Sequence, residues 1–172
     1  AQFIPRSPTR NGGLFLFGVL MRIVLLAFAL AVGSCSVRAA TLGPELVSNG
    51  GFETTDSWAV GSNWQILPGA YPQGLAFHNE GATAAISETA PLIAGHTYRV
   101  VYTISGSAGS SNPLHRFRLR GTGGVVSSPF ATGDGTFTFD LVAPAGAYQF
   151  EVWPGYGLGA ILDDVSVREY TP

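Results

Sequence analysis

The chain has 172 residues, of which 12% are charged and 46% apolar, and it is rich in glycine (23) and proline (11). This balance excludes a disordered chain and a coiled coil, and it favours one folded, turn-rich β domain. All nine basic residues are arginines, and from Ala40 onward five arginines face eleven acids, for a formal charge of −6. Such an acidic body argues against nucleic acid as a partner, because binding to phosphate backbones depends on clustered cations.

The first 40 residues have the layout of a secretory signal with an upstream extension. Met21 and Arg22 make a short basic start, which the apolar run IVLLAFALAVGS and then small residues follow. We therefore expect translation to start at Met21, residues 1–40 to be a leader, and residues 41–172 to form the domain. The apolar stretch 12–32 is long enough to span a bilayer, but Arg22 near its middle disfavours a stable anchor, so we expect no membrane span in the mature form.

Two processing routes fit the end of this leader. Small or apolar residues at 37–39 are typical of a signal-peptidase cut after Ala39. Residues 32–35 (VGSC) also fit a bacterial lipobox, in which Cys35 is acylated and becomes a lipid anchor. Cys35 is the only cysteine, so no intramolecular disulfide can form. Both routes predict an extracellular or cell-surface protein.

From Glu45 onward, short alternating runs are separated by glycine, proline, serine and asparagine, and none has a sustained helical period. Ten strands at this spacing indicate an all-β sandwich or barrel. In chain order, the expected strands are 45–47, 63–67, 74–79, 82–89, 96–105, 114–120, 124–128, 135–142, 147–153 and 160–169.

The alternation within the longer runs predicts which side chains face the core. Trp153 falls in phase with the polar face instead, and the loop-forming sequence PGYG after it leaves Tyr156 exposed. The predicted core set consists of Tyr98, Val100, Tyr102, Ile104, Phe137, Phe139, Leu141, Tyr148, Phe150 and Val152.

Three stretches carry a resemblance to a known family. The body opens with ELVSNGGFETTDSW, has SETAPLIAGHTYRVVYTISG in its middle and closes with ILDDVSVRE. In this order they resemble the jelly-roll carbohydrate-binding modules attached to xylanases and other polysaccharide hydrolases, within the galactose-binding-like superfamily, over nearly all of residues 45–169. Similar modules occur in phage tail and virion surface proteins, so the resemblance speaks for a fold more strongly than for a ligand. The fold that it implies is a two-sheet antiparallel β-sandwich, a jelly roll.

The resemblance also implies a structural calcium ion. In these modules the first and last strands lie side by side, and carboxylates from both commonly hold the ion. Matched by position, Glu53 and Asp163 are the side-chain ligands, with Asp164 and main-chain carbonyls nearby. Calcium takes about six to eight oxygen ligands, which would account for two adjacent aspartates in an otherwise apolar run. The alternative is that one aspartate is solvated and the other accepts hydrogen bonds from the opening loop.

Sugar recognition needs a flat aromatic ring for the C–H face of a pyranose, and planar polar groups for its hydroxyls. Trp64 and Tyr71 lie in a stretch rich in glycine and proline, where they could equally contact a ligand or pack within the loop. For Trp153, its phase with the polar face favours ligand contact. Trp58 is expected to pack under the first loop instead. The candidates outside the predicted core phase are Trp64, Tyr71, His78, Arg116, Arg118, Trp153 and Tyr156.

Arg116, Arg118 and Arg120 place three cations on one face of a strand. Like charges at this spacing repel, so we expect them to meet acids such as Glu151 or Asp140 across the sheet. The alternative is that they bind acidic polysaccharide or phosphorylated glycans.

Nothing in the sequence favours catalysis. It contains no G-x-S-x-G elbow, and the three histidines, at 78, 96 and 115, lie in separate runs without metal-ligand spacing. We therefore expect a secreted, non-catalytic module that binds polysaccharide or another glycan. The alternative is a structural or assembly module on a cell or virion surface, in which Trp153 and Tyr156 contact a protein partner.

Overall fold

The computed structural model describes residues 39–70, 74–81, 84–155 and 158–172, which form one compact unit. The described residues form no helix, and none of their segments is therefore a helical membrane span. Residues 1–38 of the leader, which include Cys35, lie outside them, as do Tyr71 and Tyr156. Twelve strands are present in the described ranges: β1 (Thr41–Glu45), β2 (Trp58–Val60), β3 (Trp64–Ile66), β4 (Ala76–His78), β5 (Ile86–Thr89), β6 (Thr97–Ser105), β7 (Leu114–Gly121), β8 (Gly124–Ser127), β9 (Ala131–Thr132), β10 (Gly135–Val142), β11 (Ala147–Pro154) and β12 (Ala160–Thr171).

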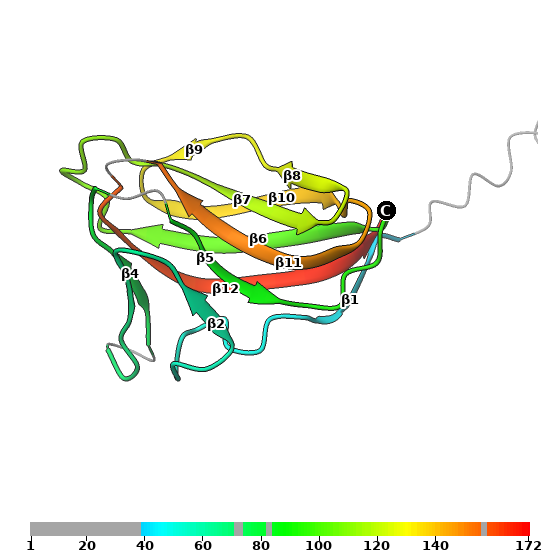
Figure 1. The fold of residues 1–172 in the computed structure, drawn as a ribbon, viewed down its shortest axis with the longest axis horizontal. Helices are drawn as coiled ribbons and strands as arrows, with labels where there is room; N and C mark the ends of the chain where they lie inside the picture. Colours follow the sequence, from blue (N-terminus) through cyan, green and yellow to red (C-terminus); the bar gives the residue numbers. More distant parts are fainter. Residues whose placement is uncertain (1–38, 71–73, 82–83, 156–157) are drawn as a thin grey trace, which may run out of the picture. The chain divides into compact units, whose positions relative to one another are not determined.

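The strands form two antiparallel sheets, which confirms the predicted all-β sandwich (Figure 1). Sheet A has the order β10-β6-β12-β4-β3, and β1 pairs with β12. Sheet B has the order β2-β5-β11-β7-β8, and β9 pairs with β7. Strands far apart in sequence are therefore neighbours in both sheets, as in β6 beside β12 and β5 beside β11.

The core lies between the sheets, and alternation along the strands builds it. On β6, Tyr98, Val100, Tyr102 and Ile104 are fully buried, as predicted. Aromatic rings join the two sheets, since the Tyr102 ring stacks on Phe117 of β7 with 5.9 Å between centroids. Burial of each such side chain stabilises the fold by roughly 1.5–3 kcal/mol.

One predicted core residue, Tyr148, lies outside the core. Its side chain is 45% exposed. Ala147 pairs with Gly121 and Gln149 with Arg120, so Tyr148 has no partner across the ladder and forms a β-bulge. The bulge changes the phase of β11, and Ala147 packs against the core in place of the tyrosine.

The first and last strands lie side by side, as the resemblance implied. β1 pairs antiparallel with β12, and Figure 1 shows the C-terminus beside β1. In the loop after β1, the amide of Val165 donates to the Gly50 carbonyl at 3.0 Å. A Cβ on Gly50 would lie 2.0 Å from the Val165 carbonyl oxygen, so only glycine permits this contact. The Trp58 indole donates to the Asn49 carbonyl at 2.8 Å, which confirms that Trp58 packs under this loop.

Glu45 fastens the two ends of the chain. Its carboxylate accepts hydrogen bonds from the Ser166 hydroxyl (2.6 Å), the Val167 amide (2.8 Å) and the Arg168 guanidinium (3.0 Å). Burial alone would raise the pKa of Glu45, but these donors together hold it below its ordinary value. The carboxylate therefore stabilises the contact between β1 and β12.

Asp163 and Asp164 stand at a second β-bulge. Asp163 pairs with Thr103 and Ser166 with Val101, so two residues of β12 oppose one residue of β6. Asp164 takes up the extra residue with a left-handed backbone (φ 52°). The adjacent aspartates thus mark an irregularity in the last strand.

Candidate functional site

The outward side of sheet B carries a group of polar and aromatic side chains that contact one another. On β7 and β11 the residues between the core positions point away from the core. The strand register places Arg118 opposite Glu151 and Arg116 opposite Trp153. On the same side, Gln149 donates to the Ser87 hydroxyl of β5 at 2.8 Å.

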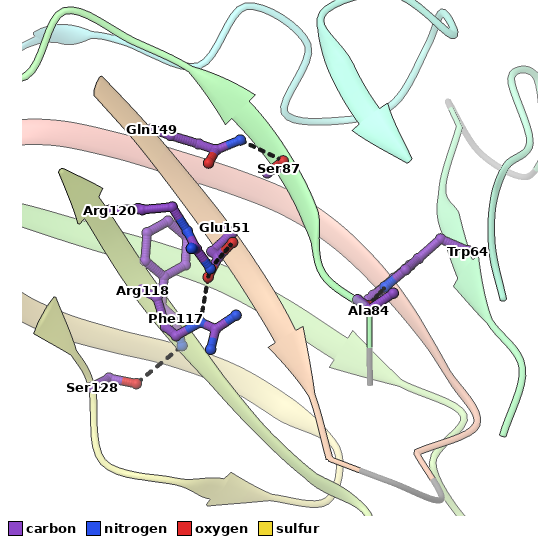
Figure 2. A network of polar contacts seen from close by, with 9 residues as sticks. All are labelled: Trp64, Ala84, Ser87, Phe117, Arg118, Arg120, Ser128, Gln149 and Glu151. Carbon is purple, nitrogen blue, oxygen red and sulfur yellow. Dashed lines mark hydrogen bonds and ion pairs between the residues drawn. The ribbon is translucent and has the colours of Figure 1, made fainter. Parts of the chain in front are cut away.

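Glu151 holds two of the three arginines of β7. Its side chain is only 5% exposed and forms ion pairs with Arg118 and, at 3.1 Å, with Arg120 (Figure 2). Burial lowers the pKa of Arg118, and the charge of Glu151 opposes this shift. The predicted pairing with an acid is confirmed for Arg118 and Arg120 but is wrong for Arg116, which forms no ion pair in the described ranges. Asp140 lies on sheet A and pairs with Arg99 instead.

Two aromatic rings hold the third arginine. The Arg116 guanidinium carbon lies 4.6 Å from the ring centroid of Phe130 and 4.8 Å from that of Trp153. Arg118 also lies over the Trp153 ring, at 5.2 Å. In the described ranges, Arg116 forms no ion pair, and its buried Nε has no hydrogen-bond partner. We call Arg116, Arg118, Arg120, Phe130 and Trp153 the arginine–aromatic face.

Phe130 was missed by the sequence reasoning. Its side chain is 49% exposed and lies in the turn between β8 and β9. Ser128 sets the position of this turn, because its hydroxyl accepts from the Phe117 amide at 3.1 Å and its own amide donates to the Phe117 carbonyl (Figure 2). The only signal in the sequence is an aromatic residue directly after Ser-Pro, next to a predicted strand end.

Trp64 and His78 belong to the core, so the expectation that they lie outside it is wrong. They pair directly across β3 and β4, with ring centroids 4.8 Å apart. Trp64 is 7% exposed, and its indole donates to the Ala84 carbonyl at 2.8 Å, which is the loop-packing alternative (Figure 2). His78 is fully buried, and burial lowers its pKa. Neither ring offers a face to a ligand.

The carboxylates predicted to bind calcium, Glu53, Asp163 and Asp164, lie at or near the bulge of β12. Burial raises the pKa of Asp163, and the negative charges of Asp164 and Glu53 raise it further. The structure thus brings Glu53 and Asp163 within electrostatic range, and no ion pair to an arginine or histidine compensates either of them in the described ranges. Within those ranges, however, no three His, Cys, Asp or Glu side chains gather into a metal-binding group. The donors fit calcium in kind, and main-chain or water oxygens would have to complete the set.

No family model and no curated protein matches the chain in sequence. Solved structures do match it in fold. The CBM22-1 xylan-binding domain of Paenibacillus barcinonensis Xyn10C aligns with a TM-score of 0.55 at 14% identity, over 78% of this chain and 97% of that one. TmCBM61, solved in complex with beta-1,4-galactotriose, aligns with a TM-score of 0.53 at 15% identity, over 74% of this chain and 99% of that one.

A larger protein shows the same likeness. The CBM22-1 and GH10 modules of endo-1,4-beta-D-xylanase 10B of Clostridium thermocellum, complexed with xylohexaose, align with a TM-score of 0.53 at 10% identity. The match covers 74% of this chain but only 28% of that one. At these identities the comparison speaks for the fold alone. The chain has the jelly-roll sandwich fold of carbohydrate-binding modules, as its sequence predicted.

Proposed function

We propose that this protein is a non-catalytic glycan-binding module whose ligand lies on the arginine–aromatic face. The observation that carries the proposal is the cluster of Phe130, Trp153 and Arg116 on the outward side of a sheet. An exposed ring can stack on the C–H face of a pyranose, and guanidinium and amide groups can pair with its hydroxyls. The ring of Phe130 is the more open platform, since two guanidinium groups lie over Trp153.

The face is held rigidly, which favours binding. Arg118 is fixed by Glu151, and Gln149 by Ser87, so their polar groups lose little freedom when a ligand binds. The backing strands β7 and β11 belong to the middle of sheet B. The leader pattern in residues 1–40 supports a site of action outside the cytoplasm, where polysaccharides occur.

Affinity electrophoresis in gels containing a panel of polysaccharides tests this function. We expect at least one polysaccharide to retard the protein, and Phe130→Ala and Trp153→Ala to abolish the retardation. Tyr170→Ala is the matched control, because Tyr170 also lies under an arginine, Arg99, but on sheet A. Loss of retardation in the control but not in the other two variants would place the ligand elsewhere.

The alternative function, assembly on a cell or virion surface, uses the same residues as protein contacts. Phe130 and Val125 are both large, exposed and apolar, and both belong to sheet B or its connecting turns, which favours this second candidate. Concentration-dependent oligomers that Phe130→Ala disperses, without retardation by any polysaccharide, would support assembly and contradict glycan binding.

A structural calcium ion is part of the proposal. Glu53 and Asp163 would supply carboxylate oxygens between the opening loop and β12, with Asp164 nearby and with main-chain or water oxygens completing the set. The ion would neutralise carboxylates that now repel each other. Its role is to fasten the chain ends, and no contact with the glycan is required of it.

A further inference from the structure

We infer that the glycan is acidic: a polysaccharide whose pyranose units carry a carboxylate or sulfate group that pairs with Arg116. This inference rests on the proposed function and names the class of sugar that the arginine–aromatic face selects. Three observations support it: the charge of the face, the ion pairs of each arginine, and the aromatic rings around Arg116.

The charge of the face is opposite to that of the domain. Among the residues of sheet B that point outward in the described ranges, three arginines meet a single carboxylate, Glu151, which leaves two positive charges. The domain as a whole has five arginines against eleven acids. The excess of cations attracts anions to this face, whereas the acidic remainder of the domain repels them.

Arg116 differs from the other arginines in its lack of an acid. Arg99 pairs with Asp140, Arg168 with Glu45, and Arg118 and Arg120 share Glu151. Throughout the described ranges, Arg116 alone among the arginines has aromatic rings and no carboxylate as partners.

The rings that hold Arg116 prepare it to bind an anion. Stacking on Phe130 and Trp153 fixes the plane of the guanidinium and removes part of its water shell. A fixed, partly desolvated guanidinium can form two parallel hydrogen bonds to a carboxylate or sulfate, and such charge-assisted bonds are about twice as strong as neutral ones. Its buried Nε, unsatisfied within the described ranges, is a donor that an incoming oxygen could use after a small side-chain movement.

The test compares two polymers that differ only in charge: polygalacturonate and its carboxyl-reduced, neutral form. By affinity electrophoresis at low salt, we expect the unaltered protein to bind polygalacturonate about tenfold more tightly than the reduced polymer. Arg116→Gln should remove this difference and lower binding to both polymers to the same weaker level, because Arg116 also belongs to the face that contacts the neutral polymer. Arg116→Lys should restore only part of it, because an ammonium group cannot form the paired contact. A sulfated galactan, run in parallel, shows whether sulfate replaces carboxylate.

The control is Arg99→Gln, which removes the same charge from sheet A and should leave the preference unchanged. An equal loss of preference in both variants would show that net charge acts, and would overturn the inference. Equal binding of both polymers by the unaltered protein would also overturn it while leaving glycan binding intact, whereas binding to no polysaccharide would defeat the proposed function itself. Should Arg116→Gln fail to fold, salt decides: a preference that persists undiminished at high salt contradicts ionic recognition.

Discussion

The outward sides of the two sheets contain the same kinds of side chain, yet they are arranged differently. On sheet A, Arg99 lies over the Tyr170 ring at 3.9 Å and donates two hydrogen bonds of 2.8 Å to Asp140. On sheet B, Arg116 lies over two rings and meets no acid in the described ranges. An arginine that stacks on an aromatic ring and also pairs with an acid has its charge neutralised within the protein. An arginine on a ring becomes a candidate binding group where the acid is absent.

The carboxylates differ in the same way. The paired carboxylates of sheet A are partly exposed, and each forms an ion pair with a single cationic side chain, as Glu45 does with Arg168 and Glu169 with His96. Glu151 of sheet B is buried and shared by two arginines. Removal of a carboxylate should therefore cost stability on both sheets, but it should disturb ligand binding only on sheet B.

The largest effect is expected from Glu151→Ala. The substitution leaves Arg118, whose side chain is only 13% exposed, without its acid, and loss of one partner of a buried ion pair costs about 3–5 kcal/mol. Urea denaturation measures the loss. Glu169→Ala is the matched control, because it removes an exposed carboxylate from sheet A and should cost no more than about 1 kcal/mol. Similar losses in both variants would contradict the contrast between the sheets.

A smaller loss is expected from Glu45→Gln, which weakens the contact between β1 and β12. The free energy of unfolding should fall by about 1–3 kcal/mol, with glycan binding unchanged. Because the folded state lowers the pKa of Glu45, its contribution is complete above the ordinary value of 4.5 and is lost as pH falls through the lower, folded value. Denaturation curves of the two proteins should thus converge in acid; a difference that stays constant would exclude this role.

The sequence predicted the long strands well because alternation needs only near neighbours. Tyr98 and Tyr102 follow the period of β6 and are buried. Tyr148 breaks the rule because a bulge depends on the partner strand, which the local pattern does not show. Trp64 and His78 lie on strands of three residues, too short for alternation to reveal a face.

The site was only partly predictable for a related reason. The common face of the β7 arginines and the pairing of Arg118 and Arg120 with Glu151 follow from alternation and charge. Phe130 contacts Arg116 only because of the path of the β8–β9 turn, which the local sequence pattern does not predict. Likewise, Glu45 accepts a hydrogen bond from Ser166, which lies 121 positions away in the sequence. Contacts between distant segments decide both the face and the closure of the chain.

Calcium should act on sheet A alone. At about ten times its Kd, the ion should stabilise the fold by about 1.4 kcal/mol, which chelator removes. Asp163→Asn should abolish the response, whereas Asp140→Asn, on the same sheet but already paired with Arg99, should retain it. If chelator does not change the melting temperature of the unaltered protein, the proposal of a structural calcium ion is wrong.

The smallest effect concerns a feature that the two sheets share, a buried histidine. Burial lowers the pKa of His78 on β4 and of His115 on β7, while hydrogen bonds to the backbone oppose the shift. The unfolded chain therefore takes up protons more readily than the folded one. Stability should be complete above the ordinary pKa of 6.5 and should decline as pH falls below it.

Thermal melts between pH 7.5 and 5.5 measure this decline, which precedes the acid loss at Glu45 because its window lies higher. His115→Gln and His78→Gln should each flatten part of the slope, since each removes one titrating group. His96→Gln is the control, because His96 is exposed beside Glu169 and should leave the slope of the buried pair in place. A slope carried by His96 alone would assign the pH response to the surface of sheet A instead of to the core that both sheets enclose.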